Sequence, residues 1–589
     1  MKKSIILSAL ALSVALTSCS DLFEPAIENN LGLEYMYNNS KYAEGILGNA
    51  YTRIPVGSPS FNEVATDDAV TNEASNSWRK MAGGTWTSSN NPMDAWTGCR
   101  AAILYLNLFL ANADKVNWAE DQTVSKMYND REKGEAYGMR AMFMYYLLRA
   151  HGGYGEDGVL YGVPIVTEPE GANTNSNIPR ATFADCIKAI NDDCDKALEL
   201  LPTNYKDVED ESQIPAKYKG ATTVQYNRVF GSKFNLRMCG RYVEAYRAKA
   251  SLLAASPAFA DGSGVTYETA ANNFATVLDR IGGPAGLDPT GNTWYCNTKD
   301  IDGIENGECK PEIMWREERG QRNTLEQDNF PPSLYGNGRI NPTQNFVDAF
   351  PMANGEPITA EGSGYNKDNP YVDRDPRLAL YVVTNGSTQG VANKTITTAA
   401  DGTTQDAINK LEGKSTRTGY YLRKLMRSDI NLDPSKKTTQ YHYNARIRFT
   451  EMFLSYAEAA NEAWGPKGKG GHGYSAYDVI KAIRERAGLG EFGEDPYLEE
   501  CAESKDKMRE LIRNERRIEL SFEGFRFYDL RRWKAPLNET AKGMSINSAD
   551  NTYTPIEVET RNYKDYMYYG PIPYSEVLKF SELQQNKGW

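Results

Sequence analysis

The segment 508–533 carries charged side chains where a simple amphipathic helix would carry apolar ones. Leu511, Ile518 and Phe522 fall on one stripe of a helix, and Glu515 lies between them. A carboxylate at such a position is costly to bury unless it is paired. It could serve as a catalytic acid, but neighbouring arginines would hold its charge rather than leave it ready for proton transfer. The pattern therefore favours a buried ion-pair network, with the nearby arginines Arg513, Arg516, Arg517 and Arg526 as partners.

The same segment carries the strongest family resemblance of the chain. Its part 515–533, ERRIELSFEGFRFYDLRRW, resembles the C-terminal signature of the SusD/RagB family of nutrient-binding outer-membrane lipoproteins. Further similar segments follow the family's order along the chain: GEAYGMRAMF at 134–143, NPTQNFVDAF at 341–350, IRERAGL at 483–489, and YGPIP at 569–573 with Gln585 and Asn586 after it. On these motifs the chain is identified as a member of the family.

The resemblance implies both a fold and a function. It implies a mainly α protein with a tetratricopeptide-like scaffold of helical hairpins, which binds oligosaccharide or polysaccharide and delivers it to a SusC-type TonB-dependent outer-membrane transporter. It implies no covalent chemistry and no cofactor. Two alternatives remain open, namely a peptide-binding lipoprotein of a peptide importer and a secreted glycoside hydrolase. A hydrolase needs two carboxylates facing each other across a cleft, and no such pair stands out in the sequence.

Aromatic side chains in polar loops are the candidate ligand contacts. Trp78 and Trp86 lie in the polar, glycine-containing segment 75–91, without a helical pattern of apolar neighbours. The C–H faces of a sugar ring stack on indole, and its hydroxyls need polar partners. The nearby polar candidates are Arg79, Asn90 and Asn91, and the resemblance also places ligand contacts in this region. Structural packing is the alternative for each tryptophan, because large aromatic side chains are usually buried.

A second aromatic group follows later in the chain. Trp294 and Tyr295 lie in a loop rich in glycine and proline, and Tyr335 lies in another glycine-containing loop. We expect these three side chains to contact the ligand. Trp315 alternates with Ile313 and so shares one face of a strand with an aliphatic side chain, which favours a place in the core.

An acidic cluster beside the second aromatic group is a weak candidate for a calcium site. Asp300, Asp302 and Glu305, with Asn306 and Glu308, offer the oxygen ligands that calcium prefers. No glycine lies where an EF-hand loop requires one, so a solvated acidic loop is favoured. We therefore assign no metal.

The N-terminus has the pattern of an exported lipoprotein. Residues 1–18 contain two lysines, an apolar run too short to span a bilayer, and small residues, as in a signal peptide. The sequence at 16–19, Leu-Thr-Ser-Cys, is a lipobox that predicts acylation of Cys19, with an ordinary secretory signal as the alternative. Residues 19–30 are interpreted as a tether, whose acidic start resembles the family's surface-export signal. We expect a lipid-anchored outer-membrane protein that faces the cell exterior.

The composition limits the classes of ligand and partner. The 589 residues are 40% hydrophobic and carry a formal net charge of −12, which argues against nucleic acid and strongly anionic glycans. Neutral or weakly charged ligands are therefore favoured. Apart from Cys19, the cysteines show no CxxC spacing, so we expect free thiols for most of them and leave a bridge between Cys296 and Cys309 open.

Helical patterns on both sides of a loop-rich region must position these residues. Apolar residues recur at helical spacing in 95–113, 132–150, 182–201, 241–256, 267–280, 448–464, 476–487 and 504–522. The expected organisation is a first helical part at 31–281, a loop-rich insert at 282–439 with strand-like fragments at 312–316 and 378–383, and a C-terminal helical part at 440–589. Long loops in compact proteins are often functional. We therefore expect the binding surface to be built from the insert and from a loop at about 58–92.

Overall fold

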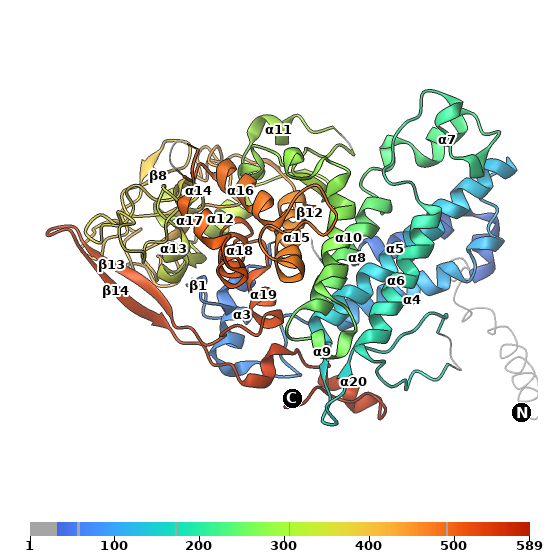
Figure 1. Ribbon diagram of the computed structural model, residues 1–589, viewed down its shortest axis with the longest axis horizontal. Coiled ribbons are helices and arrows are strands. Elements are labelled where there is room, and N and C mark those ends of the chain that lie inside the picture. The colour runs from blue at the N-terminus through green and yellow to red at the C-terminus, as the bar shows by residue number, and fades with distance from the viewer. Residues whose placement is uncertain (1–31, 56–58, 171–173, 306, 491–492) are drawn as a thin grey trace, which may run out of the picture.

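Long helices form one side of the molecule, and short elements joined by loops form the other (Figure 1). The computed structural model describes residues 32–55, 59–170, 174–305, 307–490 and 493–589. The predicted signal peptide, the predicted tether and Cys19 lie outside the described residues.

The helical side is built from helices that pack against their neighbours in chain order. Helix α5 packs against α4 and α6, α8 packs against α6 and α10, and α10 packs against α15, which contacts α16 and α18. This arrangement confirms the predicted mainly α fold. The longer helices are α2 (Ser40–Tyr51), α4 (Trp96–Leu110), α5 (Gln122–His151), α6 (Phe183–Leu200), α7 (Thr223–Phe230), α8 (Gly240–Ala255), α10 (Tyr267–Asp279), α15 (Phe449–Trp464), α16 (Ala476–Ala487) and α18 (Lys505–Glu519).

Side-chain caps set the ends of these helices. The Thr182 side chain accepts a hydrogen bond from the backbone of Asp185 at the start of α6, and Ser475 forms a capping box at the start of α16. Asp121 caps α5 in the same way, so this helix begins at Gln122. The sequence pattern placed its start at 132, because residues 122–131 are mostly polar and show no clear apolar stripe.

Glycines allow α5 to approach its neighbours closely. A Cβ atom on Gly138 would lie 2.8 Å from side-chain atoms of Met238 and Val243, and one on Gly134 would lie 2.6 Å from Leu201. Such distances are shorter than carbon–carbon contact allows. Gly134 and Gly138 therefore let α5 sit directly on α8 and on the end of α6.

The other side contains short helices and two-stranded antiparallel sheets. The strand predicted at 312–316 is confirmed as β4 (Ile313–Arg316), which pairs with β12 (Ala445–Arg448). The strand predicted at 378–383 is wrong for its first part. Asp375 caps a short helix there, α14 (Pro376–Tyr381), and only β7 (Val382–Val383) is extended. The remaining short helices are α3 (Ser77–Lys80), α9 (Ala260–Ser263), α11 (Thr298–Asp302), α12 (Thr324–Asn329), α13 (Gln344–Ala349), α17 (Pro496–Cys501), α19 (Arg526–Arg532) and α20 (Tyr574–Lys579).

The longest strands form a hairpin near the C-terminus that the sequence patterns did not reveal. Strands β13 (Ala541–Asn547) and β14 (Thr552–Glu559) pair with each other and project at the left of Figure 1. They lie within the part that was expected to be helical. The other strand pairs are β1 (Ala69–Thr71) with β6 (Ile340–Pro342), β2 (Gly153–Tyr154) with β3 (Leu160–Tyr161), β5 (Gly320–Arg322) with β11 (Gln440–His442), β7 with β10 (Tyr421–Leu422), and β8 (Thr388–Gln389) with β9 (Lys394–Thr395).

Two large apolar cores correspond to the two sides. The first lies among the long helices and includes Trp315, whose ring stacks on Tyr242 with 4.8 Å between centroids. The indole N–H of Trp315 donates to the carbonyl of Leu236, and the side chain is fully buried, so its predicted place in the core is confirmed. The second core contains Trp78, Trp86, Trp294 and Tyr295.

Candidate functional site

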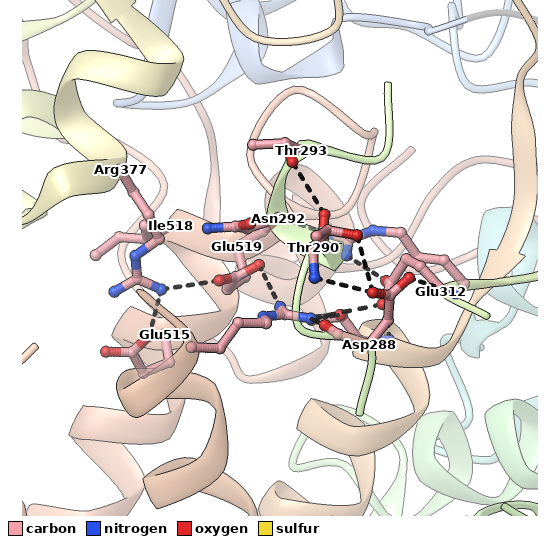
Figure 2. A network of polar contacts seen from close by, with 12 residues as sticks. Asp288, Thr290, Asn292, Thr293, Glu312, Arg377, Glu515, Ile518 and Glu519 are labelled. Atoms are coloured by element: carbon pink, nitrogen blue, oxygen red, sulfur yellow. Dashed lines mark hydrogen bonds and ion pairs between the residues drawn. The ribbon is translucent and has the colours of Figure 1, made fainter. Parts of the chain in front are cut away.

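A buried network of ion pairs joins α18 to residues distant in the sequence (Figure 2). Arg377 donates to the carboxylates of Glu515 at 2.8 Å and Glu519 at 3.1 Å. Arg484 donates to the other oxygen of Glu515 at 2.9 Å. These side chains are almost completely shielded from solvent. The predicted buried network around Glu515 is therefore present.

The predicted partners of Glu515 are wrong. The nearby arginines pair elsewhere: Arg513 with Glu510, Arg516 with Asp529, and both Arg517 and Arg526 with Asp67. The true partners, Arg377 and Arg484, lie 138 and 31 residues away along the chain. The local sequence indicated that Glu515 needs cationic partners, but it did not indicate which arginines supply them.

The same network fixes the loop that precedes Trp294. Arg486 donates to the carboxylate of Glu519 at 3.0 Å and to the backbone carbonyl of Asp288 at 3.3 Å. The backbone N–H of Glu312 donates to the Asp288 carboxylate at 3.1 Å. Figure 2 shows Asp288 beside Glu312, with Glu519 in the same network of polar contacts. The loop that carries Trp294 is thus attached to α18 through charged groups.

The arginines around Glu519 keep its carboxylate ionised. Burial raises the pKa of Glu519, but the surrounding Arg486, Arg377 and Arg448 outweigh burial and lower the pKa to about 2. Glu519 is therefore a carboxylate at neutral pH. Its charge stabilises the arrangement and is not available for acid catalysis.

Two adjoining cavities, which we call the central cleft, lie where the two sides of the molecule meet. The larger has a volume of about 400 Å³ and is lined by residues of α4 and α5, by Trp78 and Trp294, and by residues 523–525 and 528. The smaller has a volume of about 260 Å³, and its wall includes Tyr295 and Tyr443. Both are lined by Trp294, which stands between them. The cleft therefore brings together Trp78, Trp294 and Tyr295, which the sequence presented as separate candidates.

Trp294 lines the cleft and has an unused hydrogen-bond donor. Its ring packs on Tyr443 with 5.5 Å between centroids, and only 9% of the residue is exposed. The indole N–H is buried and has no hydrogen-bond partner among the described residues. By contrast, Tyr295 donates its hydroxyl to the carbonyl of Leu380 at 3.3 Å. Trp294 thus combines an apolar face with a donor that lacks an acceptor.

The other predicted contacts do not line the central cleft. Trp86 is 3% exposed, packs on Trp589, and donates its indole N–H to Asn91 at 3.0 Å, as the packing alternative expects. Arg79 pairs with Glu559 at 3.0 Å, and the Asn90 side chain donates to the carbonyl of Thr85. Tyr335 is 59% exposed on another part of the surface. A ligand contact by any of these side chains stays a prediction.

The acidic candidates Asp300, Asp302 and Glu305 do not form a metal-ligand set. Asp302 is paired with Arg427 at 2.7 Å, and Asp300 accepts a hydrogen bond from Asn297 at 2.6 Å. Within the described ranges, no three His, Cys, Asp or Glu side chains are placed to hold a metal ion.

Sequence reasoning missed several residues of the cleft. Arg149 on α5 lines the larger cavity with Tyr146 and Tyr528, and Arg446 on β12 lines it as well. Arg149 is the one charged side chain in the stretch 141–150, and this isolated cation among apolar and aromatic residues is the signal that could have identified it. Tyr528 lies inside the segment 515–533, where the many charged side chains gave no signal that an aromatic residue lines a cavity.

Two further expectations concern cysteines and membrane spans. Cys296 and Cys309 are partly buried free thiols, like the other cysteines of the described residues. Among the described helices, none has the length and apolar character needed to cross a membrane.

Comparisons with known proteins agree with the fold. Residues 311–589 match the model of the SusD family, and residues 39–219 match a model described as starch-binding associating with outer membrane. The structure is similar to that of a SusD-like protein from Bacteroides fragilis NCTC 9343, with a TM-score of 0.70 and 22% identity, covering 96% of this chain and 100% of that one. A SusD-like carbohydrate binding protein from the same organism gives a TM-score of 0.67 and 20% identity, covering 93% of this chain and 100% of that one.

Sequence comparison also finds SusD-like relatives. The chain is 27% identical to the SusD-like protein P25 of Formosa agariphila over 300 residues, which cover 46% of this chain and 47% of that protein. The matches span less than half the length of the curated relatives. The helical scaffold and the arrangement of its loops define a SusD-like fold. The chain belongs to the SusD/RagB family.

Proposed function

We propose that the protein is a surface-exposed outer-membrane lipoprotein that binds an oligosaccharide in the central cleft and passes it to a SusC-type TonB-dependent transporter. Membership of the SusD/RagB family supports this proposal. The description of one structurally similar protein as carbohydrate binding also supports the proposal.

The unpartnered indole N–H of Trp294 is the observation that carries the proposal. A buried donor without an acceptor lowers the stability of the free protein, and a ligand hydroxyl that reaches it recovers that loss. Sugar rings combine hydroxyl acceptors with C–H faces that stack on indole. Trp294 and Trp78, both in the wall of the larger cavity, offer the aromatic surface for this mode of binding.

The two glutamates of the larger cavity favour binding over glycoside hydrolysis. A hydrolase needs one carboxyl group with a raised pKa opposite a second carboxylate. Glu451 and Glu523 line the larger cavity, but Glu451 is paired with Lys249 at 2.7 Å and Glu523 with Arg448 at 2.7 Å. Arg448 and Lys424 outweigh the effect of burial and lower the pKa of Glu523. Glu523 therefore lacks the protonation behaviour of a general acid.

The anchor and the transporter are the parts of the proposal that rest on the sequence. The lipobox ending at Cys19 supports lipid attachment. A surface binder with no spanning helix in its described part needs a partner to move a ligand inward, and a transporter in the same membrane supplies that path.

Titration calorimetry on three tryptophan variants tests the proposal. Trp294→Ala removes the ring and the donor, whereas Trp294→Phe keeps an aromatic face and removes only the N–H. Trp118→Phe is the matched control, because the indole N–H of Trp118 bonds to the protein itself and the ring lies in the other core. With a glycan that the wild type retains, we expect Trp294→Ala to weaken binding by about 1 to 3 kcal/mol and Trp294→Phe by about 0.5 to 1.5 kcal/mol.

The outcomes separate the rival functions. Unchanged affinity in both Trp294 variants, with correct folding by circular dichroism, would place glycan binding outside the central cleft. Retention of peptides but of no glycan would favour the peptide-binding alternative. Release of reducing sugar from a polysaccharide would favour the hydrolase.

A further inference from the structure

The two glutamates that line the larger cavity of the central cleft each have a lysine or arginine partner. Asp94, Glu451 and Glu523 are the acidic residues of this wall. Asp94 lies 3.1 Å from His151, Glu451 lies 2.7 Å from Lys249, and Glu523 lies 2.7 Å from Arg448. Glu451 and Glu523 are therefore not available to neutralise a further cation.

Arg149 is a further cation in this wall, and it has no carboxylate partner. Its guanidinium carbon lies 3.9 Å from the ring centroid of Tyr528 and 5.0 Å from that of Tyr146, so aromatic rings hold it in place. Its Nε atom is buried without a hydrogen-bond partner, and within the described ranges its guanidinium forms no ion pair. A shielded charge without a counter-ion is unfavourable.

Arg446 lies in the same wall and also contacts an aromatic ring, but it has a distant ion pair. Its guanidinium carbon lies 4.8 Å from the ring centroid of Trp315, and its Nε atom is also buried without a partner. The nearest carboxylate, that of Glu317, lies 3.8 Å from its Nη2 atom, which is beyond hydrogen-bond distance. Arg149, Arg446 and Trp294 thus line one cavity, and each has a buried N–H group without an acceptor.

We propose that the cleft selects an acidic oligosaccharide, and that Arg149, assisted by Arg446, binds the carboxylate or sulfate group of that ligand. This inference rests on the proposed glycan-binding function. The planar fork of arginine donates two parallel hydrogen bonds to a carboxylate or a sulfate. An anion at this position supplies both the missing counter-charge and the missing acceptors, whereas a neutral sugar supplies acceptors alone.

This proposal differs from what the overall charge suggests. The net charge of −12 favours neutral ligands, because it describes the average field around the whole molecule. In the cleft wall Glu451 and Glu523 are already paired, while Arg149 has no carboxylate partner among the described residues. The local balance is positive, and contacts at hydrogen-bond distance are screened less than the distant surface charges. The cleft can therefore bind an anion although the protein is acidic.

The test uses an array of matched oligosaccharides, followed by calorimetry. The array presents the same backbones in three forms: neutral, with uronic acids, and with sulfate esters. For a retained glycan, the affinity is measured for wild type, Arg149→Gln, Arg149→Lys and Arg446→Gln. Arg247→Gln is the matched control, since Arg247 lies on α8 outside the cleft and is paired with Asp195.

We expect acidic forms to be retained in preference to their neutral counterparts. Arg149→Gln should weaken binding of the acidic glycan about 10- to 100-fold, and Arg446→Gln by less, while Arg247→Gln leaves it unchanged. Arg149→Lys should recover only part of the affinity, because lysine lacks the fork. Preference for uronic acids or for sulfate esters identifies which anion the cleft takes.

Two results would overturn the inference. If the retained glycans are neutral, or if correctly folded Arg149→Gln and Arg446→Gln bind the acidic glycan as the wild type does, the cleft does not select an anion, and the proposed function stands. If no glycan of any form is retained while peptides are, the proposed function fails and the inference fails with it.

Discussion

The guanidinium of Arg377 lies 2.8 Å from the carboxylate of Glu515, although 138 residues separate the two in the sequence. Arg377 also donates to Asp375 and Glu519, and all four side chains are fully buried. This group of charges joins the loop-rich insert to α18, and through Glu519 and Arg486 it reaches the loop that carries Trp294.

Removal of Arg377 should destabilise the protein strongly. In Arg377→Met, three buried carboxylates lose a partner, and uncompensated buried charge costs about 3 to 5 kcal/mol. Denaturant titration measures the free energy of unfolding. Lys188→Met is the control, because its pair with Asp192 on α6 is solvent-exposed and contributes little to stability. Equal effects of the two changes would contradict the structural role of the network.

Glu63 should make stability depend on pH in the mildly acidic range. Burial raises its pKa from 4.5 to about 7, although backbone N–H groups, including that of Gly524, oppose this change. The folded state therefore holds the proton more tightly than the unfolded state does. Stability is fully present below pH 4.5 and is lost as pH rises through 7, by on the order of 3 kcal/mol in total.

Glu63→Gln tests this dependence, because the glutamine oxygen can still accept from Gly524 while the side chain has no proton to lose. We expect the variant to flatten the change in unfolding free energy between pH 4.5 and 7. Glu510→Gln changes an exposed carboxylate on α18 and should leave the profile as it is in the wild type. A wild-type profile retained in Glu63→Gln would show that another group is responsible.

Gly138→Ala should destabilise the protein although alanine favours helices. The added Cβ would lie 2.8 Å from atoms of Met238 and Val243, and overpacking of this kind costs about 1 to 3 kcal/mol against a gain of up to about 1 kcal/mol in helix propensity. Gly45→Ala on α2 is the control, since its Cβ would meet no atom within 4 Å and should be neutral or stabilising. Thermal unfolding of both variants checks the sign. A higher melting temperature for Gly138→Ala would show that α5 and α8 are not in close contact.

Cys19→Ala should release the protein from the membrane fraction and abolish its labelling by a lipid precursor, because the lipobox places the acyl chains on this residue. Affinity purification in mild detergent should recover a TonB-dependent transporter with the wild type. Some recovery should persist with Cys19→Ala if protein surfaces contribute to the contact. If the Cys19→Ala variant stays in the membrane fraction and is still labelled by lipid, the lipobox prediction is wrong. If no barrel partner is recovered, and deletion of the protein leaves ligand uptake unchanged, the predicted transporter complex is wrong.

The sequence indicated most of the long helices but not the β13–β14 hairpin or the assembly of the site. The apolar pattern at 476–487 coincides with α16, because caps and periodicity are local properties. The partners of Glu515 and the neighbours of Trp86 are not local: Arg377 and Trp589 reach them only after the chain folds. Trp86 and Trp294 both lie in loops, yet one is held by Asn91 and the other keeps a free donor beside two cavities. Only the folded structure shows which of the two tryptophans lines the central cleft.

A crystal structure with a retained oligosaccharide tests the central claim most directly. The account expects a sugar ring in the central cleft, within about 4 Å of the ring of Trp294, with an oxygen of the ligand accepting from the indole N–H. A sugar bound elsewhere, for example beside the exposed ring of Tyr335, with the central cleft free of ligand, would contradict it.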